Sequence, residues 1–186
     1  MADRLTKAQR SELMSHIHSK NTKPEVALRC ALWRRGFRYR VNVKSLPGSP
    51  DIVLPKHRTV VFVHGCFWHA HKGCKIYHLP QTNSVFWLAK VKRNQERDQE
   101  VWRQLEAKGW SVVIVWECEL TKAIFEDTVE NVASEIINDG NLFRKRQKER
   151  REMREQRRLE RKEADSRRQS LMEEIGNIMP RKKKKP

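Results

Sequence analysis

The sequence predicts one α/β domain in three layers, with helices covering both faces of a central mixed sheet, followed by a basic helical tail. Two nearly continuous apolar segments, residues 59–64 and 111–116, are typical of buried central strands. Together with the segments around them, the predicted order along the chain is helix, two or three strands, loop, helix, strand, helix. Of the 43 Leu, Ile, Val and Phe residues, 37 lie in residues 1–140, so this part can build a core and the remainder cannot.

The N-terminal part predicts a polar arm and a first helix. Residues 1–20 are polar and basic, with one short apolar group at helical spacing. Thr22 is a suitable N-cap, Pro24 suits the first turn, and Glu25 completes a capping box. We expect this helix to end at Gly36.

Short strands follow this helix. Residues 37–43 alternate apolar and basic side chains, and residues 51–54 form a second strand-like run that Pro55 closes. The segment 65–84 contains glycines, cysteines and histidines but few apolar side chains. It therefore predicts a loop that is held by something other than a hydrophobic core.

Two helical segments flank the second buried strand. Residues 85–108 have a period near 3.6 and are followed by Gly109, which predicts a helix that ends there. Residues 123–137 predict another helix, and Asp139 and Gly140 predict its end.

The charge distribution separates the tail from the domain. The chain has a net charge of +17, and residues 141–186 hold 18 basic and 8 acidic side chains. They predict a charged helix to about residue 173 and a disordered lysine-rich end. A basic surface favours phosphate partners, without separating DNA from RNA or anionic lipid. No apolar run reaches the ~20 residues that span a bilayer, and no secretory signal follows Met1. We expect a chain of the cytoplasm or nucleoid, where four cysteines stay reduced.

Cysteine and histidine spacing predicts a structural zinc site. The ligands are Cys66, His71, Cys74 and Cys118, the last directly after the second buried strand. A Cys₃His set binds zinc tetrahedrally and would supply folding free energy to a loop that lacks a core. The alternative is a group of ordinary buried thiols with a surface histidine.

The fourth zinc ligand stays open on spacing alone, because His69 and His78 compete with His71. Cys30 lies on a helix and is interpreted as a core residue rather than a ligand.

Charged side chains near the strand ends predict a catalytic cleft. Asp51 begins one strand and His64 ends its neighbour, so the two can share a cleft with His69. A carboxylate suits Mg²⁺, and a histidine can transfer a proton near neutral pH. A turn residue is the alternative for Asp51. Asp98 lies in an apolar helix stripe, where a carboxylate needs a buried partner.

Bulky aromatic residues flank the same loop. Phe67 and Trp68 lie between Cys66 and His69, and Phe86 and Trp87 follow the loop. They either pack in a core or stack on and wedge between bases.

These motifs together resemble the very short patch repair (Vsr) endonuclease family, from about residue 8 to residue 138. The matching motifs, in order, are SLPGSPD (45–51), FVHGCFWH (62–69), PxTN (80–83), FW (86–87), NxxRD (94–98) and VWEC (115–118). The resemblance implies the restriction-endonuclease-like fold, with residues 62–64 in place of the acid-x-Lys motif of other members of that fold. It implies a nuclease that nicks DNA 5′ to the T of a T·G mismatch, which arises when 5-methylcytosine deaminates, and that accompanies a cytosine-5 DNA methyltransferase.

The resemblance also assigns catalytic roles. Asp51 becomes the principal Mg²⁺ ligand, beside the backbone carbonyl of Val63. His69 activates the attacking water, and Asp98 orients His69. His64 lies by the scissile phosphate, and Glu25 lies near the metal-bound waters.

The same resemblance assigns the remaining contacts. Phe67, Trp68 and Trp87 wedge into duplex DNA from the major groove, and Met14 from the minor groove. The Cys₃His set, with His71 as the histidine, holds zinc. The implied organisation is a DNA-contacting arm (1–20), a nuclease domain (21–140) and a basic tail (141–186) to which the family gives no role. The expected partners are T·G-mismatched duplex DNA and mismatch-repair proteins, with the chain a monomer and no membrane partner.

Two other functions compete. A zinc-containing module that binds nucleic acid without catalysis would use the same basic surface, but it needs neither Asp51 nor the histidines. A Cys-His hydrolase would use Cys66 as its nucleophile, which requires a thiol that is not bound to zinc.

Overall fold

The computed structural model describes Thr6, Gln9, Glu12 and residues 20–178, with residues 171–178 described by their backbone alone. Met14 and most of the predicted arm 1–20 lie outside the described residues, as does the end predicted to be disordered. The chain divides into two compact units, Met1–Asn141 and Leu142–Pro186.

The first unit contains a mixed three-stranded sheet, as predicted. Its strands are β1 (Ile52–Leu54), β2 (Thr59–His64) and β3 (Ser111–Trp116), in the order β1-β2-β3. β1 runs antiparallel to β2, and β2 runs parallel to β3. The sheet therefore brings the C-terminal ends of β2 and β3 to the same edge.

The strand predicted over residues 37–43 is wrong. This segment makes only an isolated antiparallel bridge, between Arg40 and Val53, with both backbone N–H···O distances 2.8 Å. Asn42 has a φ of 47°, which takes the backbone out of the extended region after the bridge. Alternation of side chains does not reveal such a break.

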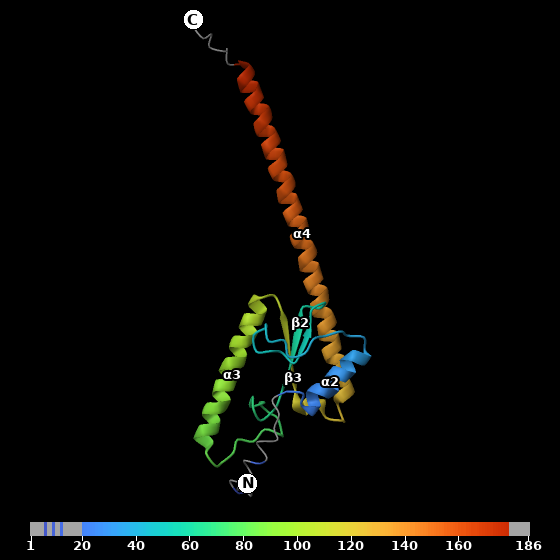
Figure 1. Cartoon of the computed structure of the whole chain (residues 1–186), viewed down its shortest axis with the longest axis vertical. Helices are drawn as coiled ribbons and strands as arrows, with labels where there is room; N and C mark the ends of the chain where they lie inside the picture. Colours follow the sequence, from blue (N-terminus) through green and yellow to red (C-terminus); the bar gives the residue numbers. More distant parts are fainter. Residues whose placement is uncertain (1–5, 7–8, 10–11, 13–19, 179–186) are drawn as a thin grey trace. The chain divides into compact units, whose positions relative to one another are not determined.

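Helices α2 (Lys23–Arg34), α3 (Ser84–Ala107) and α4 (Phe125–Ile178) accompany the sheet, with a short 3₁₀ helix η1 (Glu117–Leu120) after β3 (Figure 1). Residues of α2, of the start of α4 and of one sheet face form one core, which includes Leu28, Leu32, Val61 and Ile136. Val60, Phe62 and Leu105 form a second core between the other face and α3. Helices thus cover both faces, and the three layers are confirmed. No described helix is both long and apolar enough to cross a bilayer.

The predicted helix end at Asp139–Gly140 is wrong, because α4 continues through both residues. A Cβ at Gly140 would lie 2.6 Å from His57 Nδ1 and 3.3 Å from its Cα. The glycine lets the helix approach the turn between β1 and β2 closely. A glycine inside a helix costs ~1 kcal/mol relative to alanine, and α4 nevertheless continues through Gly140.

Candidate active site and metal centre

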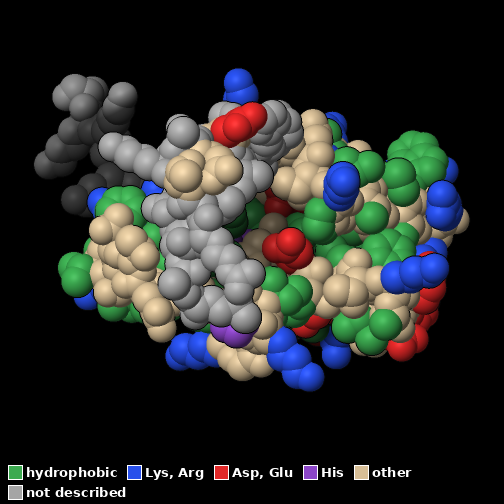
Figure 2. All heavy atoms as spheres, turned by 90° about the horizontal axis from the view of Figure 1, so that it is seen from below, with side chains coloured by type: hydrophobic (Ala, Val, Ile, Leu, Met, Phe, Trp, Pro, Cys, Tyr) green, Lys and Arg blue, Asp and Glu red, His purple; other side chains and the backbone are tan. Residues whose placement is uncertain are grey.

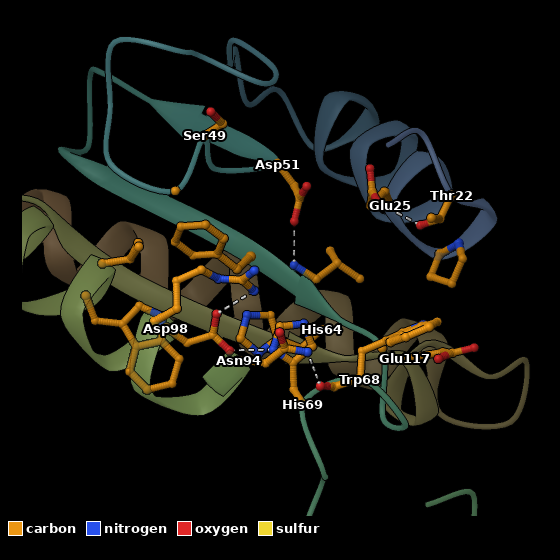
Figure 3. Close-up of a pocket in the computed structure, with 18 of the residues that line it drawn as sticks. Thr22, Glu25, Ser49, Asp51, His64, Trp68, His69, Asn94, Asp98 and Glu117 are labelled. Atoms are coloured by element: carbon orange, nitrogen blue, oxygen red, sulfur yellow. Dashed lines mark hydrogen bonds and ion pairs between the residues drawn. The ribbon is translucent and has the colours of Figure 1, made fainter. Parts of the chain in front are cut away.

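A cleft of about 1100 Å³ opens where α2, the start of β1, the end of β2 and α3 meet. Figure 2 shows acidic side chains at a hollow in the face seen from below, and Lys and Arg side chains around the outline of that view. The cleft contains the five residues predicted to be catalytic, which are Glu25, Asp51, His64, His69 and Asp98. Figure 3 shows that these residues come from three different regions of the fold.

Asp51 lies just before β1, beside the central strand. Its Oδ2 accepts a hydrogen bond from the backbone N–H of Val63, at 2.8 Å. Burial raises the pKa of Asp51 to about 6, and the negative charge of Glu25 adds to this rise. The preceding loop packs tightly, because Gly48 has a φ of +70° and a Cβ there would lie 2.5 Å from Val101 Cγ1. Asp51 is therefore a positioned carboxylate in the cleft and not only a turn residue.

Glu25 is buried and fixed by three donors. Its Oε2 accepts from the backbone N–H of Asn21 at 2.8 Å and pairs with Arg29 at 3.0 Å. Its Oε1 accepts from the Thr22 hydroxyl at 2.8 Å. The predicted capping box is wrong in detail, since the Thr22 side chain caps no backbone N–H. The Thr22 hydroxyl and the Asn21 N–H hold the carboxylate instead.

His69 and Asp98 form a close pair across the cleft wall. His69 Nδ1 lies 2.5 Å from Asp98 Oδ2. The buried carboxylate in the apolar stripe of α3 thus has a histidine partner. Because Nδ1 faces Asp98, Nε2 is the ring nitrogen left for another partner.

His64 stacks on His69, with ring centroids 3.8 Å apart and planes inclined by 14°. Burial, with the nearby His69, lowers the pKa of His64 to about 4. Its buried Nδ1 has no hydrogen-bond partner among the described residues. The imidazole of His64 is therefore neutral at neutral pH, and it packs against one face of the His69 ring.

Helix α3 positions the backbone of the loop that carries His69. Asn94 donates to the Trp68 carbonyl at 2.8 Å, and Gln95 donates to the His69 carbonyl at 3.3 Å. Arg97 contacts the second oxygen of Asp98 at 3.2 Å. The role of Gln95 in holding this loop was not predicted. Helical spacing could have indicated it, because Gln95 lies about one turn before Asp98 on α3.

The thiols and imidazole of Cys66, His71, Cys74 and Cys118 converge within 4.8 Å of one another. His71 Nδ1 lies 3.6 Å from Cys66 Sγ and 3.3 Å from Cys118 Sγ. The edges of a tetrahedron with Zn–S and Zn–N bonds have about these lengths. The group can thus hold a metal ion, and His71 is its histidine, since His69 pairs with Asp98 and His78 is not in the group.

One neighbour of this group was not predicted, and the remaining cysteine, Cys30, does not lie where it was predicted. The Trp116 ring stacks on His71 at 4.0 Å, with planes inclined by 2°, and so fixes the imidazole. No local pattern predicts this contact, because it joins residues 45 positions apart. The core interpretation of Cys30 is wrong, since Cys30 is exposed on α2.

The aromatic residues form a cluster that belongs to neither core. Phe67 contacts Trp68 and Trp87 edge to face, with ring centroids 5.2 and 5.0 Å apart. Phe86 contacts Trp87 and is 56% exposed. The rings therefore support one another at the surface beside the cleft, and the core-packing alternative does not hold for them.

Comparison with known proteins identifies the family. The family described as DNA mismatch endonuclease Vsr matches residues 2–75. DNA mismatch endonuclease Vsr of Escherichia coli (strain K12) is 45% identical over 143 residues, which cover 75% of this chain and 91% of that protein. Type II nicking enzyme V.NmeAIP of Neisseria meningitidis serogroup A is 50% identical over 137 residues, covering 73% of this chain and 97% of that protein. Type II nicking enzyme V.XorIIP of Xanthomonas oryzae pv. oryzae is 50% identical over 121 residues, covering 65% and 88%. The chain belongs to the Vsr family of DNA mismatch endonucleases.

Proposed function

We propose that the protein is a Mg²⁺-dependent endonuclease that nicks one strand of duplex DNA 5′ to the T of a T·G mismatch. The observation that carries this proposal is the presence of Asp51 and the His69–Asp98 pair in one cleft. Relatives named as a mismatch endonuclease and as nicking enzymes support the reaction class. The three-layer arrangement around a mixed sheet supports a restriction-endonuclease-like fold.

Asp51 and the Val63 carbonyl hold the catalytic Mg²⁺ in this proposal, with Glu25 close to the waters around it. The electrostatics favour a cation, because two carboxylates share the cleft and Glu25 helps raise the pKa of Asp51. Hard oxygen ligands suit Mg²⁺. Bound there, Mg²⁺ would stabilise the negative charge that develops on the phosphate.

His69 serves as the general base. Asp98 holds the proton of the imidazole on Nδ1, which leaves Nε2 to accept a proton from the water that attacks phosphorus. His64 is neutral at neutral pH and keeps the His69 ring in its plane by stacking. Loss of either contact would let the base rotate away from the scissile phosphate.

The surface aromatic cluster recognises the mismatch. Phe67, Trp68 and Trp87 enter the duplex as wedges beside the cleft, together with Met14 from the N-terminal arm. A mispaired step costs less to unstack than a matched one, so the wedge favours mismatched DNA. The net charge of +17 supports binding to the phosphates.

The Cys₃His group holds a structural Zn²⁺. The convergence of three sulfurs and one nitrogen, with no open carboxylate among them, supports zinc over a hard cation. The ion would fix the loop that carries Phe67, Trp68 and His69. Cys66 is then a ligand, which argues against a nucleophilic role for this thiol.

The test is a nicking assay on end-labelled duplexes that carry T·G, T·A or C·G at one position, with and without added Mg²⁺. We expect one cut, 5′ to the T, only in the T·G duplex with Mg²⁺. Asp51→Asn should bind the T·G duplex and leave it intact. Binding without any cut by the unmodified protein would favour the alternative, a zinc-containing module without catalysis.

A further inference from the structure

The C-terminal part of α4 carries an arginine stripe, which we define as Arg146, Arg150, Arg154, Arg157, Arg161 and Arg168. At 100° per residue these side chains fall within a sector of roughly 80°. Between residues 144 and 170 that sector contains one further residue, Ala164. All six arginines lie within α4 and are exposed.

The rest of the same helix has a different composition. Between residues 144 and 170, all six acidic side chains lie outside the stripe's sector, among seven basic ones; they are Glu149, Glu152, Glu155, Glu160, Glu163 and Asp165. The ion pairs described in this segment are Lys148–Glu152, Arg158–Glu155 and Arg167–Glu163. Each of them uses a basic residue outside the arginine stripe.

The stripe works against helix stability. Arg146 and Arg150, and likewise Arg150 and Arg154, are four residues apart, so like charges lie beside each other. An exposed helix needs no such arrangement, because the glutamates could alternate with arginines on every face. Segregation of six arginines onto one side is what a helix needs when that side meets a polyanion.

We propose that the arginine stripe is a binding site for the phosphate backbone of duplex DNA that reads no base sequence. The stripe is ~33 Å long at 1.5 Å per residue, close to one turn of B-DNA. Arginine forks suit phosphate oxygens. Between Phe143 and Leu171 the only large apolar side chains are Met153 and Leu159. The helix therefore lacks the apolar face that an interfacial membrane helix needs.

This site rests on the proposed function only in that the protein works on DNA. It adds a second contact, which holds the enzyme on matched DNA around the mismatch. Each phosphate contact adds about 0.9 to the slope of log affinity against log salt. The effect should therefore be equal for matched and mismatched duplexes.

The experiment compares two variants of the full chain that lose the same charge. The stripe variant replaces Arg150, Arg154, Arg157 and Arg161 by Gln. The control replaces Lys145, Lys148, Lys162 and Arg167 by Gln, on other sides of the same helix. Gln has nearly the helix propensity of Arg and Lys, and circular dichroism verifies the helix content of each variant.

Fluorescence anisotropy with a labelled 30-base-pair matched duplex, over a series of salt concentrations, gives affinity and slope. We expect the stripe variant to lose roughly 2–4 in slope and the control clearly less. Single-turnover nicking of a saturating T·G duplex should stay unchanged, which separates this site from the nuclease cleft. Equal losses in both variants would overturn the stripe as a site, leaving only net charge. An unchanged slope in the stripe variant would overturn DNA as the partner and point to an acidic protein surface.

Discussion

His69 Nδ1 lies 2.5 Å from Asp98 Oδ2, and the ring of His69 stacks on that of His64. The two contacts fix the imidazole in both its rotation and its plane. The carboxylate of Asp98, which is buried in the apolar stripe of α3, thereby holds the more exposed ring of His69 in the cleft. In the proposed mechanism Asp98 is the orienting acid and His69 is the reacting base.

Asp98→Asn should reduce single-turnover nicking by about 10²–10⁴-fold while binding of the T·G duplex changes little. The amide has no charge and can donate to Nδ1, which would place the ring proton on the nitrogen that must accept one. Glu100→Gln, an exposed change on the same helix, is the control. Near-normal nicking by Asp98→Asn would remove His69 as the base.

The stability of the protein without added Mg²⁺ should depend on pH through two opposed groups. Asp51 has a pKa of about 6 against a usual 3.8, so its contribution to folding stability is lost as the pH rises from about 4 to 6. His64 has a pKa of about 4 against a usual 6.5, so its contribution to folding stability grows as the pH rises from about 4 to 6.5. Each shift corresponds to about 3 kcal/mol, and in the unmodified chain they largely offset each other.

Asp51→Asn should remove one of the two opposed effects, so that the pH dependence of folding stability due to His64 becomes measurable. The free energy of unfolding by urea, measured from pH 4 to pH 7, should then rise with pH much more steeply than in the unmodified protein. Asp127→Asn changes an exposed carboxylate and should leave the pH curve unchanged. Parallel curves for all three proteins would show that Asp51 is not held in a desolvated site.

Much of the fold was predictable because its signals are local. The apolar runs of β2 and β3 and the periodicity of α3 give the layers directly. Some errors are local, such as the break at Asn42, but the wrong helix end comes from a contact made far along the chain. Gly140 indicated a helix end, but its missing Cβ makes room for His57, and nothing near residue 140 in the sequence reports that approach.

The candidate site was also predictable only in part. The sequence motifs pointed to Asp51, His64, His69 and the three cysteines of the metal-binding group, and the structure brings them into two groups. Spacing did not decide between His71 and His69 as the metal ligand, because the choice depends on Asp98, which lies 29 residues from His69. The support of His71 by Trp116 and of Glu25 by Arg29 was not predicted, since each is a property of packing.

Gly140→Ala should destabilise the protein, against the usual gain of about 1 kcal/mol for this change inside a helix. The new Cβ would meet His57 Nδ1 at 2.6 Å, and the backbone of His57 limits how far the side chain can move away. Thermal unfolding measures the sign. Ser134→Ala, on the exposed side of the same helix, should be neutral or slightly stabilising. A higher melting temperature for Gly140→Ala would show that the turn yields easily.

Cys118→Ser should release the metal of the Cys₃His group and lower the melting temperature sharply, because the ion ties the end of β3 to the loop after β2. Metal analysis of the purified protein should find about one zinc per chain in the unmodified protein and none in the variant. Cys30→Ser is the matched control, since Cys30 is an exposed thiol on α2. Full zinc content in Cys118→Ser would show that this thiol is no ligand.

Trp68→Ala should weaken binding to T·G duplexes much more than binding to matched duplexes. The Trp68 ring lies in the surface cluster with Phe67 and Trp87 and adds to neither core, so its removal leaves the packing of the sheet intact. A wedge gains most where the base step opens at least cost, and a mispaired step opens more cheaply than a matched one. Base–aromatic stacking is worth ~1–3 kcal/mol, which predicts a loss of roughly 5- to 150-fold on the mismatched duplex. Trp33→Ala removes an exposed tryptophan of α2 that does not line the cleft and should change neither affinity. Equal losses on both duplexes for Trp68→Ala would mean that the ring contributes general affinity and does not sense the mismatch.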